Sequence, residues 1–108
     1  NHMMFGEIGG WLYKGLGGIY PDSKFPGFKH IILKPYIPKE LKQFEATHNS
    51  PYGKIYSGWR QVGNKVIYKV IVPPNSTATL FLPDNVSDSN KRMELKSGTY
   101  SFDLNFIK

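Results

Sequence analysis

In the stretch KVIYKVIV, residues 65–72, apolar and polar side chains alternate with a period of two. This alternation is typical of a β-strand that has one face against an apolar core and the other in solvent. The stretch TATLFL, residues 77–82, alternates in the same way, and Pro73, Pro74 and Asn75 lie between the two. Because proline and asparagine favour turns, the two stretches predict strands joined by a turn.

The rest of the chain from Phe25 onward divides in the same manner. Strands are predicted at residues 28–34, 43–49, 54–60, 65–72, 77–82, 91–95 and 99–106. Clusters of turn-forming residues separate them, and no helical pattern intervenes. Seven short strands at this spacing predict a mainly β fold, an antiparallel, jelly-roll-like β-sandwich.

The N-terminal part of the chain has a different period. Apolar residues recur there at helical spacings of three and four: Phe5, Ile8, Leu12, Leu16 and Ile19. Interspersed glycines weaken this helix, each interior glycine by about 1 kcal/mol relative to alanine. We therefore expect one N-terminal helix that depends on packing against other helices and ends at Pro21. The predicted division is a helix and linker over residues 1–24 and a β-sandwich over residues 25–108.

Composition limits the partners. The net charge is +6, but the lysines are scattered and no zinc-finger or basic-helix pattern occurs, so nucleic acid is not an expected partner. Glu7, Lys14 and several glycines interrupt the apolar stretch near the N-terminus, so it does not predict a membrane span. Cysteine is absent, which excludes disulfides and thiolate chemistry.

No complete catalytic or metal site is predicted within the chain. The acidic residues fall in predicted loops or on polar strand faces, and no two are placed to flank one substrate. His2, His30 and His48 lack the spacing of metal ligands, and no cofactor is expected. Four aromatic residues suit a platform that stacks on sugar rings: Tyr52, Tyr56, Trp59 and Tyr100. Trp59 and Tyr52 are the leading candidates, although alternation places Trp59 equally well in the core.

Several strings along the chain together carry a resemblance. They are NH (1–2), FG (5–6), GGWLY (9–13), GIYPD (18–22), PGFKH (26–30), SPYGKI (50–55), SGW (57–59), VPPNSTA (72–78) and SGTYSF (97–102). In this order and spacing they resemble the C-terminal region of bacterial α-L-rhamnosidases of glycoside hydrolase family 78. The resemblance covers essentially the whole chain.

The resemblance implies that an (α/α)6 barrel carries the chemistry and that a β-sandwich follows it. Residues 1–24 would be the last barrel helix and its linker, and His2 would contact rhamnose without acting as acid or base. The parent enzyme would hydrolyse terminal, non-reducing α-L-rhamnose from glycosides with inversion. Its catalytic acid and base would lie upstream of residue 1, so the 108 residues alone are expected to be inactive. Gly10 stands where the family often has an acidic residue, so no carboxylate of this segment receives a role.

Two alternatives remain open, a carbohydrate-binding module and a protein-interaction β-sandwich from an unrelated parent. The expected partners are the barrel of the same parent chain and, through it, rhamnosides. In the isolated chain the apolar N-terminal helix is expected to fold onto the sandwich, to be disordered or to mediate self-association. The residues do not decide the compartment; a periplasmic or secreted parent is the first expectation and a cytoplasmic one the second.

Overall fold

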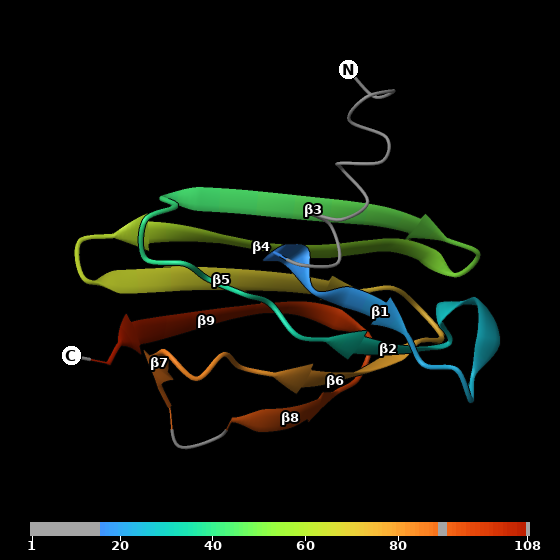
Figure 1. Cartoon of the computed structure of the whole chain (residues 1–108). Helices are drawn as coiled ribbons and strands as arrows, with labels where there is room; N and C mark the ends of the chain where they lie inside the picture. The colour runs from blue at the N-terminus through green and yellow to red at the C-terminus, as the bar shows by residue number, and fades with distance from the viewer. Residues whose placement is uncertain (1–15, 89–90, 108) are drawn as a thin grey trace.

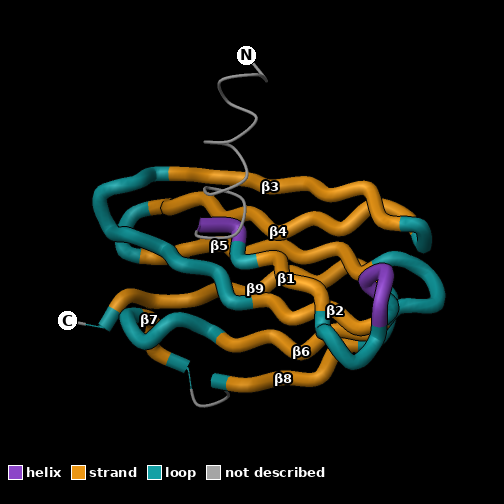
Figure 2. The backbone as a smooth tube through the Cα atoms, turned by 45° about the vertical axis from the view of Figure 1, so that its right-hand side comes forward, coloured by secondary structure: helices purple, strands orange, loops and turns teal. Residues whose placement is uncertain are grey.

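The computed structural model describes residues 16–88 and 91–107, and Figure 1 shows two β-sheets stacked as a sandwich. The strands are β1 (Ile19–Pro21), β2 (His30–Leu33), β3 (Gln43–Ser50), β4 (Gly53–Val62), β5 (Lys65–Val72), β6 (Thr77–Phe81), β7 (Val86–Ser87), β8 (Arg92–Leu95) and β9 (Gly98–Phe106). A single 3-10 turn, η2 (Pro26–Phe28), precedes β2. Figure 2 shows that strands make up most of the described chain. The predicted mainly β sandwich is confirmed.

The two sheets differ in how their strands pair. The larger sheet has the order β3-β4-β5-β9-β7, and every neighbouring pair in it is antiparallel. The smaller sheet has the order β1-β2-β6-β8, and β2 and β6 run parallel, with His30 opposite Thr77. This pair departs from the predicted antiparallel arrangement. Parallel neighbours need a long crossover, which here contains the whole β3-β4-β5 meander.

The start of the described chain also departs from the prediction. Ile19 was expected at the end of a helix, but it lies in β1 opposite Leu33 of β2, and its side chain is fully buried. Gly18 has a φ of +68°, a left-handed conformation that redirects the chain into the strand. Residues 1–15 of the expected helix lie outside the described chain, and Leu16 and Gly17 form a short π-helical turn. The division at residue 24 stays a prediction, although β1 itself pairs within the smaller sheet.

The core lies between the sheets and is formed by the inward-facing alternate residues of both. Its largest fully buried apolar side chains are those of Ile19, Ile31, Leu33, Ile37, Ile55, Val66, Tyr68, Val70, Leu80, Val86 and Leu104. The Ser57 hydroxyl donates to the carbonyl of Gly17 at 2.8 Å. Since a hydroxyl has one proton, the Tyr68 hydroxyl must donate to Ser57 Oγ, 2.8 Å away. The buried polar atoms of this group are therefore paired.

The chain enters the sandwich between β1 and β3. A side chain at Gly17 would place its Cβ 2.6 Å from Cβ of Ala46, so only glycine fits there. The backbone N–H of Tyr36 donates to the carbonyl of Leu16 at 3.1 Å, which fixes the entry point from the other side. Within residues 16–88 and 91–107, no helix has the length and hydrophobicity that spanning a bilayer requires.

Candidate functional site

The candidate site lies on the outer face of the larger sheet. In β5 the even-numbered residues from Val66 to Val72 are buried, so the odd-numbered residues point outward. Residues that are paired across neighbouring strands point to the same face of the sheet, so the pairing with β5 shows which residues of β4 and β3 point outward. Glu45, Gly58 and Lys69 form one outward-facing row across β3, β4 and β5.

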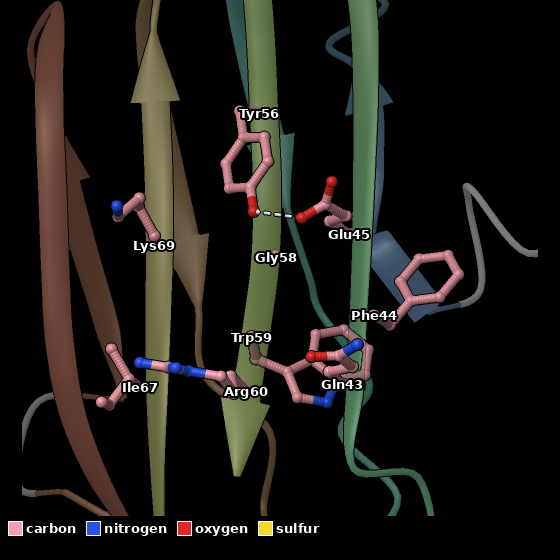
Figure 3. Close-up of a pocket in the computed structure, with 9 residues that line it drawn as sticks. All are labelled: Gln43, Phe44, Glu45, Tyr56, Gly58, Trp59, Arg60, Ile67 and Lys69. Carbon is pink, nitrogen blue, oxygen red and sulfur yellow. Dashed lines mark hydrogen bonds between the residues drawn. The ribbon is translucent and has the colours of Figure 1, made fainter. Parts of the chain in front are cut away.

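Gly58 makes a gap in this face because it has no side chain. A Cβ on Gly58 would lie 2.6 Å from the hydroxyl oxygen of Tyr56 and 2.9 Å from its Cζ. The ring of Tyr56 therefore lies over Gly58, and its hydroxyl donates to Oε2 of Glu45 at 3.1 Å (Figure 3). The glycine is what allows the tyrosine ring to lie along the sheet instead of standing away from it.

A hollow of about 390 Å³ opens at this point. It is lined by Gln43, Phe44, Glu45, Tyr56, Gly58, Trp59, Arg60, Ile67 and Lys69. Arg60 and Lys69 make no ion pair with any residue of the described chain. One carboxylate and two unpaired cations give the hollow a positive balance. It therefore offers hydrogen-bond acceptors, donors and an aromatic ring within one small area (Figure 3).

The hydroxyl of Tyr56 stays protonated at neutral pH. Partial burial raises its pKa above the usual value near 10, and the hydrogen bond and negative charge of Glu45 raise the pKa further. The phenol is thus a permanent donor to Glu45, which orients the carboxylate. The second oxygen of Glu45 has no hydrogen bond within the described chain and is available to a ligand.

Of the two leading candidates from the sequence, Trp59 borders the hollow from the core and Tyr52 lies outside it. Trp59 is 3% exposed and packs in the core against Phe44, with ring centroids 5.4 Å apart. Its burial leaves no ring face for stacking on sugar. Tyr52 lies in the turn between β3 and β4, half-buried and about 20 Å along the strand from Trp59. The two rings form no common platform, and His2 lies outside the described residues.

Tyr56 belongs to the same predicted set of aromatic residues but was not its leading member. Glu45, Gly58 and Lys69 were not predicted as site residues, because their proximity depends on strand register. A signal was present in the alternation of β5. Its phase, carried across a two-residue turn, places Tyr56 outward and Trp59 inward.

The outer face of the smaller sheet holds a contrasting cluster. Nε2 of His30 is 2.8 Å from Oγ1 of Thr79, and the Thr79 hydroxyl donates to Glu94 at 2.9 Å. His30 must then donate through Nε2, so in the neutral ring Nδ1 accepts from Thr77, 2.6 Å away. Arg92 completes the chain with a 3.3 Å ion pair to Glu94. These groups satisfy one another. No group of three potential metal ligands occurs in the described part of the chain.

Comparison with known sequences finds a family that matches most of the chain. Residues 18–97 match the family model of the bacterial α-L-rhamnosidase C-terminal domain. An α-L-rhamnosidase of Formosa agariphila is 35% identical over 108 residues, which are 100% of this chain and 11% of that protein. An α-L-rhamnosidase of Streptomyces avermitilis is 29% identical over 100 residues, covering 93% of this chain and 9% of that protein. The chain thus spans about a tenth of the length of these relatives.

Two solved structures of α-L-rhamnosidases contain a region with the same fold as this chain. The crystal structure of native α-L-rhamnosidase from Aspergillus terreus superposes with a TM-score of 0.77 at 27% identity, over 91% of this chain and 11% of that one. The α-L-rhamnosidase of Streptomyces avermitilis in complex with L-rhamnose gives 0.73 at 26% identity, over 92% of this chain and 11% of that one. The matched part of these enzymes is the C-terminal domain and not the catalytic one. The chain therefore belongs to the family of bacterial α-L-rhamnosidase C-terminal domains.

Proposed function

We propose that this chain is the accessory β-sandwich of an α-L-rhamnosidase and that it stabilises the catalytic barrel of the same parent protein. The parent would hydrolyse terminal, non-reducing α-L-rhamnose from glycosides with inversion. The observation that carries the proposal is the family match over residues 18–97, most of the sandwich, in a chain that covers 11% of a full-length relative. The same match sets aside the hypothesis of an unrelated parent.

The arrangement of carboxylates supports a non-catalytic role. Inverting hydrolysis needs two carboxyl groups about 6.5–9.5 Å apart on either side of the scissile bond. Glu45 and Glu94 lie on the outer faces of opposite sheets, with the core between them. Asp103, the other acidic residue on the outer face of the larger sheet, is three strands from β3, about 14 Å away. Neither spacing suits the reaction.

The entry point of the chain supports the place of the interface. Leu16 enters beside β3, where the ring of Phe44 lies 3.7 Å from the position of a Cβ on Gly17. Leu16 and Phe44 are half-buried against the core, and Tyr36, whose backbone N–H donates to Leu16, is 58% exposed. Clustered exposed apolar side chains mark interaction surfaces. We propose that this side of the sandwich faces the barrel, with residues 1–24 as its last helix and linker and His2 in contact with rhamnose.

Activity assays test the catalytic part of the proposal. The parent protein should hydrolyse an aryl α-L-rhamnoside, and proton NMR of the first product should show the inverted anomer. The isolated 108 residues should show no turnover in the same assay. An inactive parent would remove the assigned activity, and turnover by the isolated chain would remove the accessory role.

A single substitution measured in two contexts tests the interface. Tyr36→Ala should change the stability of the isolated chain by less than about 0.5 kcal/mol, because the residue is a surface one. In the parent it should lower the melting temperature of the domain, because a covered ring would be lost. Lys65→Ala, on the outer face of the larger sheet, is the control and should be neutral in both. Equal effects of Tyr36→Ala in both proteins would place the interface elsewhere.

A further inference from the structure

The hollow over Gly58 has the features of a binding site that the accessory role does not use. The aromatic ring of Tyr56 lies over the backbone of β4, and a Cβ on Gly58 would be 2.6 Å from its hydroxyl oxygen. Figure 3 looks onto this ring, with Glu45 on one side and Lys69 on the other. An aromatic ring that lies along a sheet offers its face to a ligand from solvent, and the apolar C–H face of a sugar ring matches such a surface.

The polar groups around the ring are of complementary kinds. Glu45 keeps one carboxylate oxygen without a hydrogen bond within the described chain, and carboxylate oxygens accept from sugar hydroxyls. Lys69 lies two strands from Glu45, a Cα separation of about 10 Å, so a ligand ring fits between them over Gly58. Arg60 lies next to Gly58 in the same hollow, two residues along β4 on the same face.

The charges that line the hollow favour a negatively charged ligand. Arg60 and Lys69 have no ion-pair partner in the described chain, whereas Arg92 on the opposite sheet is paired with Glu94. Two cations and one carboxylate attract a ligand that bears a negative group. The volume of about 390 Å³ is near the lower limit of small-molecule sites, about 300 Å³, and restricts the ligand to one or two sugar rings.

We propose that the hollow over Gly58 binds an anionic saccharide of one or two rings. Tyr56 stacks on the sugar ring, Glu45 accepts hydrogen bonds from its hydroxyl groups, and Lys69 and Arg60 contact its carboxylate or sulfate. Another hollow of the described chain, beside Pro73 and Pro74, has a single charged side chain, that of Lys54, and lacks an aromatic ring. The proposal does not depend on what reaction the parent catalyses.

NMR titration of the isotope-labelled chain tests the site. The probes are methyl α-L-rhamnoside as the neutral sugar, D-glucuronate and D-glucose 6-sulfate as the anionic sugars, and acetate as an anion without a sugar ring. We expect amide shifts centred on Gly58 and Lys69, and an affinity for one anionic sugar about threefold or more above that for the neutral sugar. The stronger of the two anionic probes identifies carboxylate or sulfate as the preferred group. Acetate should produce no such centre.

Matched variants assign the roles. Tyr56→Ala should weaken the binding of every sugar by about tenfold, whereas Tyr36→Ala, which removes an exposed tyrosine outside the hollow, should leave it unchanged. Lys69→Gln should remove the preference for the anionic sugar and keep the neutral affinity. Lys65→Gln, on the same face of β5 but outside the hollow, is its control. Gly58→Ala should displace the ring of Tyr56 and lower sugar affinity, and a native-like spectrum confirms that it folds.

Two results would overturn the proposal. One is the absence of shifts around Gly58 with all three sugars in a chain whose spectrum is folded. The other is an equal loss of anionic preference in Lys69→Gln and Lys65→Gln, which would mean a general effect of net charge. Neither result bears on the rhamnosidase activity of the parent, which is assayed separately.

Discussion

The two sheets of the sandwich use sequence neighbours in different ways. In the larger sheet, β3, β4 and β5 follow one another through two-residue turns, with Ser50 opposite Gly53 and Val62 opposite Lys65. In the smaller sheet, β2 pairs with β6 across an interval of 47 residues. The first arrangement is local and depends on turn geometry. The second depends on contacts between segments that are far apart in the sequence.

The outer faces of the two sheets also differ, in whether their polar side chains bond to one another. On the smaller sheet, His30, Thr79 and Glu94 bond to one another in a continuous chain. On the larger sheet, Tyr56 and Glu45 are joined, but Lys69 has no ion-pair partner in the described chain. A face whose polar groups are satisfied by each other contributes to stability. A face with unpaired groups around a hollow is open to a ligand.

Gly18→Ala should have the largest effect and would show how tightly the smaller sheet constrains the backbone where β1 begins. The residue has a φ of +68°, and a new Cβ would lie 2.0 Å from the carbonyl oxygen of Lys34. The backbone must move, which breaks the 2.7 Å hydrogen bond from Lys34 N to Gly18 O. We expect a loss of about 5 kcal/mol in the free energy of unfolding, measured by urea denaturation.

Gly63→Ala, in the turn between β4 and β5, is the matched control in the local meander. Its φ of +64° is similar, but no atom lies within 4 Å of the new Cβ. Only backbone strain remains, and the expected loss is about 1 kcal/mol. Equal losses for the two variants would mean that the contact between Gly18 and Lys34 constrains the backbone no more than the hairpin turn at Gly63 does.

Leu80→Ala and Leu104→Ala compare what each sheet contributes to the shared core. The two side chains are 0% and 1% exposed, one in β6 of the smaller sheet and one in β9 of the larger sheet. Each truncation should cost about 3 kcal/mol, as buried leucines generally do. Thermal unfolding followed by circular dichroism should remain a single transition in both. Two transitions in either variant would show that the sheets unfold separately.

Tyr68→Phe tests the polar group between the sheets. The substitution removes the hydrogen bond to Ser57, which keeps its bond to Gly17, and should cost about 1 kcal/mol. Burial raises the pKa of Tyr68 well above its usual value near 10. Because the folded-state pKa is raised, the stabilisation is complete below pH 10 and is lost as the pH rises above it.

The measurement for Tyr68→Phe is the free energy of unfolding between pH 8 and pH 11. The wild-type chain should lose stability above pH 10 more steeply than the variant. Tyr36→Phe, at an exposed ring, should follow the wild-type curve. Parallel curves for wild type and Tyr68→Phe would assign the alkaline sensitivity to other groups.

Arg92→Ala should have the smallest effect. It compares the exposed end of the chain of bonds through His30, Thr79, Glu94 and Arg92 with its buried centre. The ion pair with Glu94 is exposed, with side chains 67% and 61% accessible, so its removal should change stability by less than about 0.5 kcal/mol. Thr79→Val, at the buried centre of the same cluster, should cost about 1 kcal/mol or more. A larger loss for Arg92→Ala than for Thr79→Val would contradict the proposed order.

The candidate site shows the limit of sequence-based prediction more clearly than the fold. Residues 54–60 contain both Tyr56 and Trp59, and their pattern alone does not decide which of the two rings faces solvent. Register with β5 decides between them, since Trp59 lies opposite the buried Tyr68. Glu45 and Lys69 are not close in sequence and line one hollow because both are paired with Gly58 in a three-strand row.

Alternation and turn residues by themselves determined the strands of the local meander, predicted at 43–49, 54–60 and 65–72 and found at 43–50, 53–62 and 65–72. These features act between residues close in sequence, so they are visible without a structure. The short strands β1 and β7 and the parallel pairing of β2 with β6 were decided by tertiary structure alone. Each depends on packing between segments distant in sequence, and a stretch of two or three residues is too short to show a period.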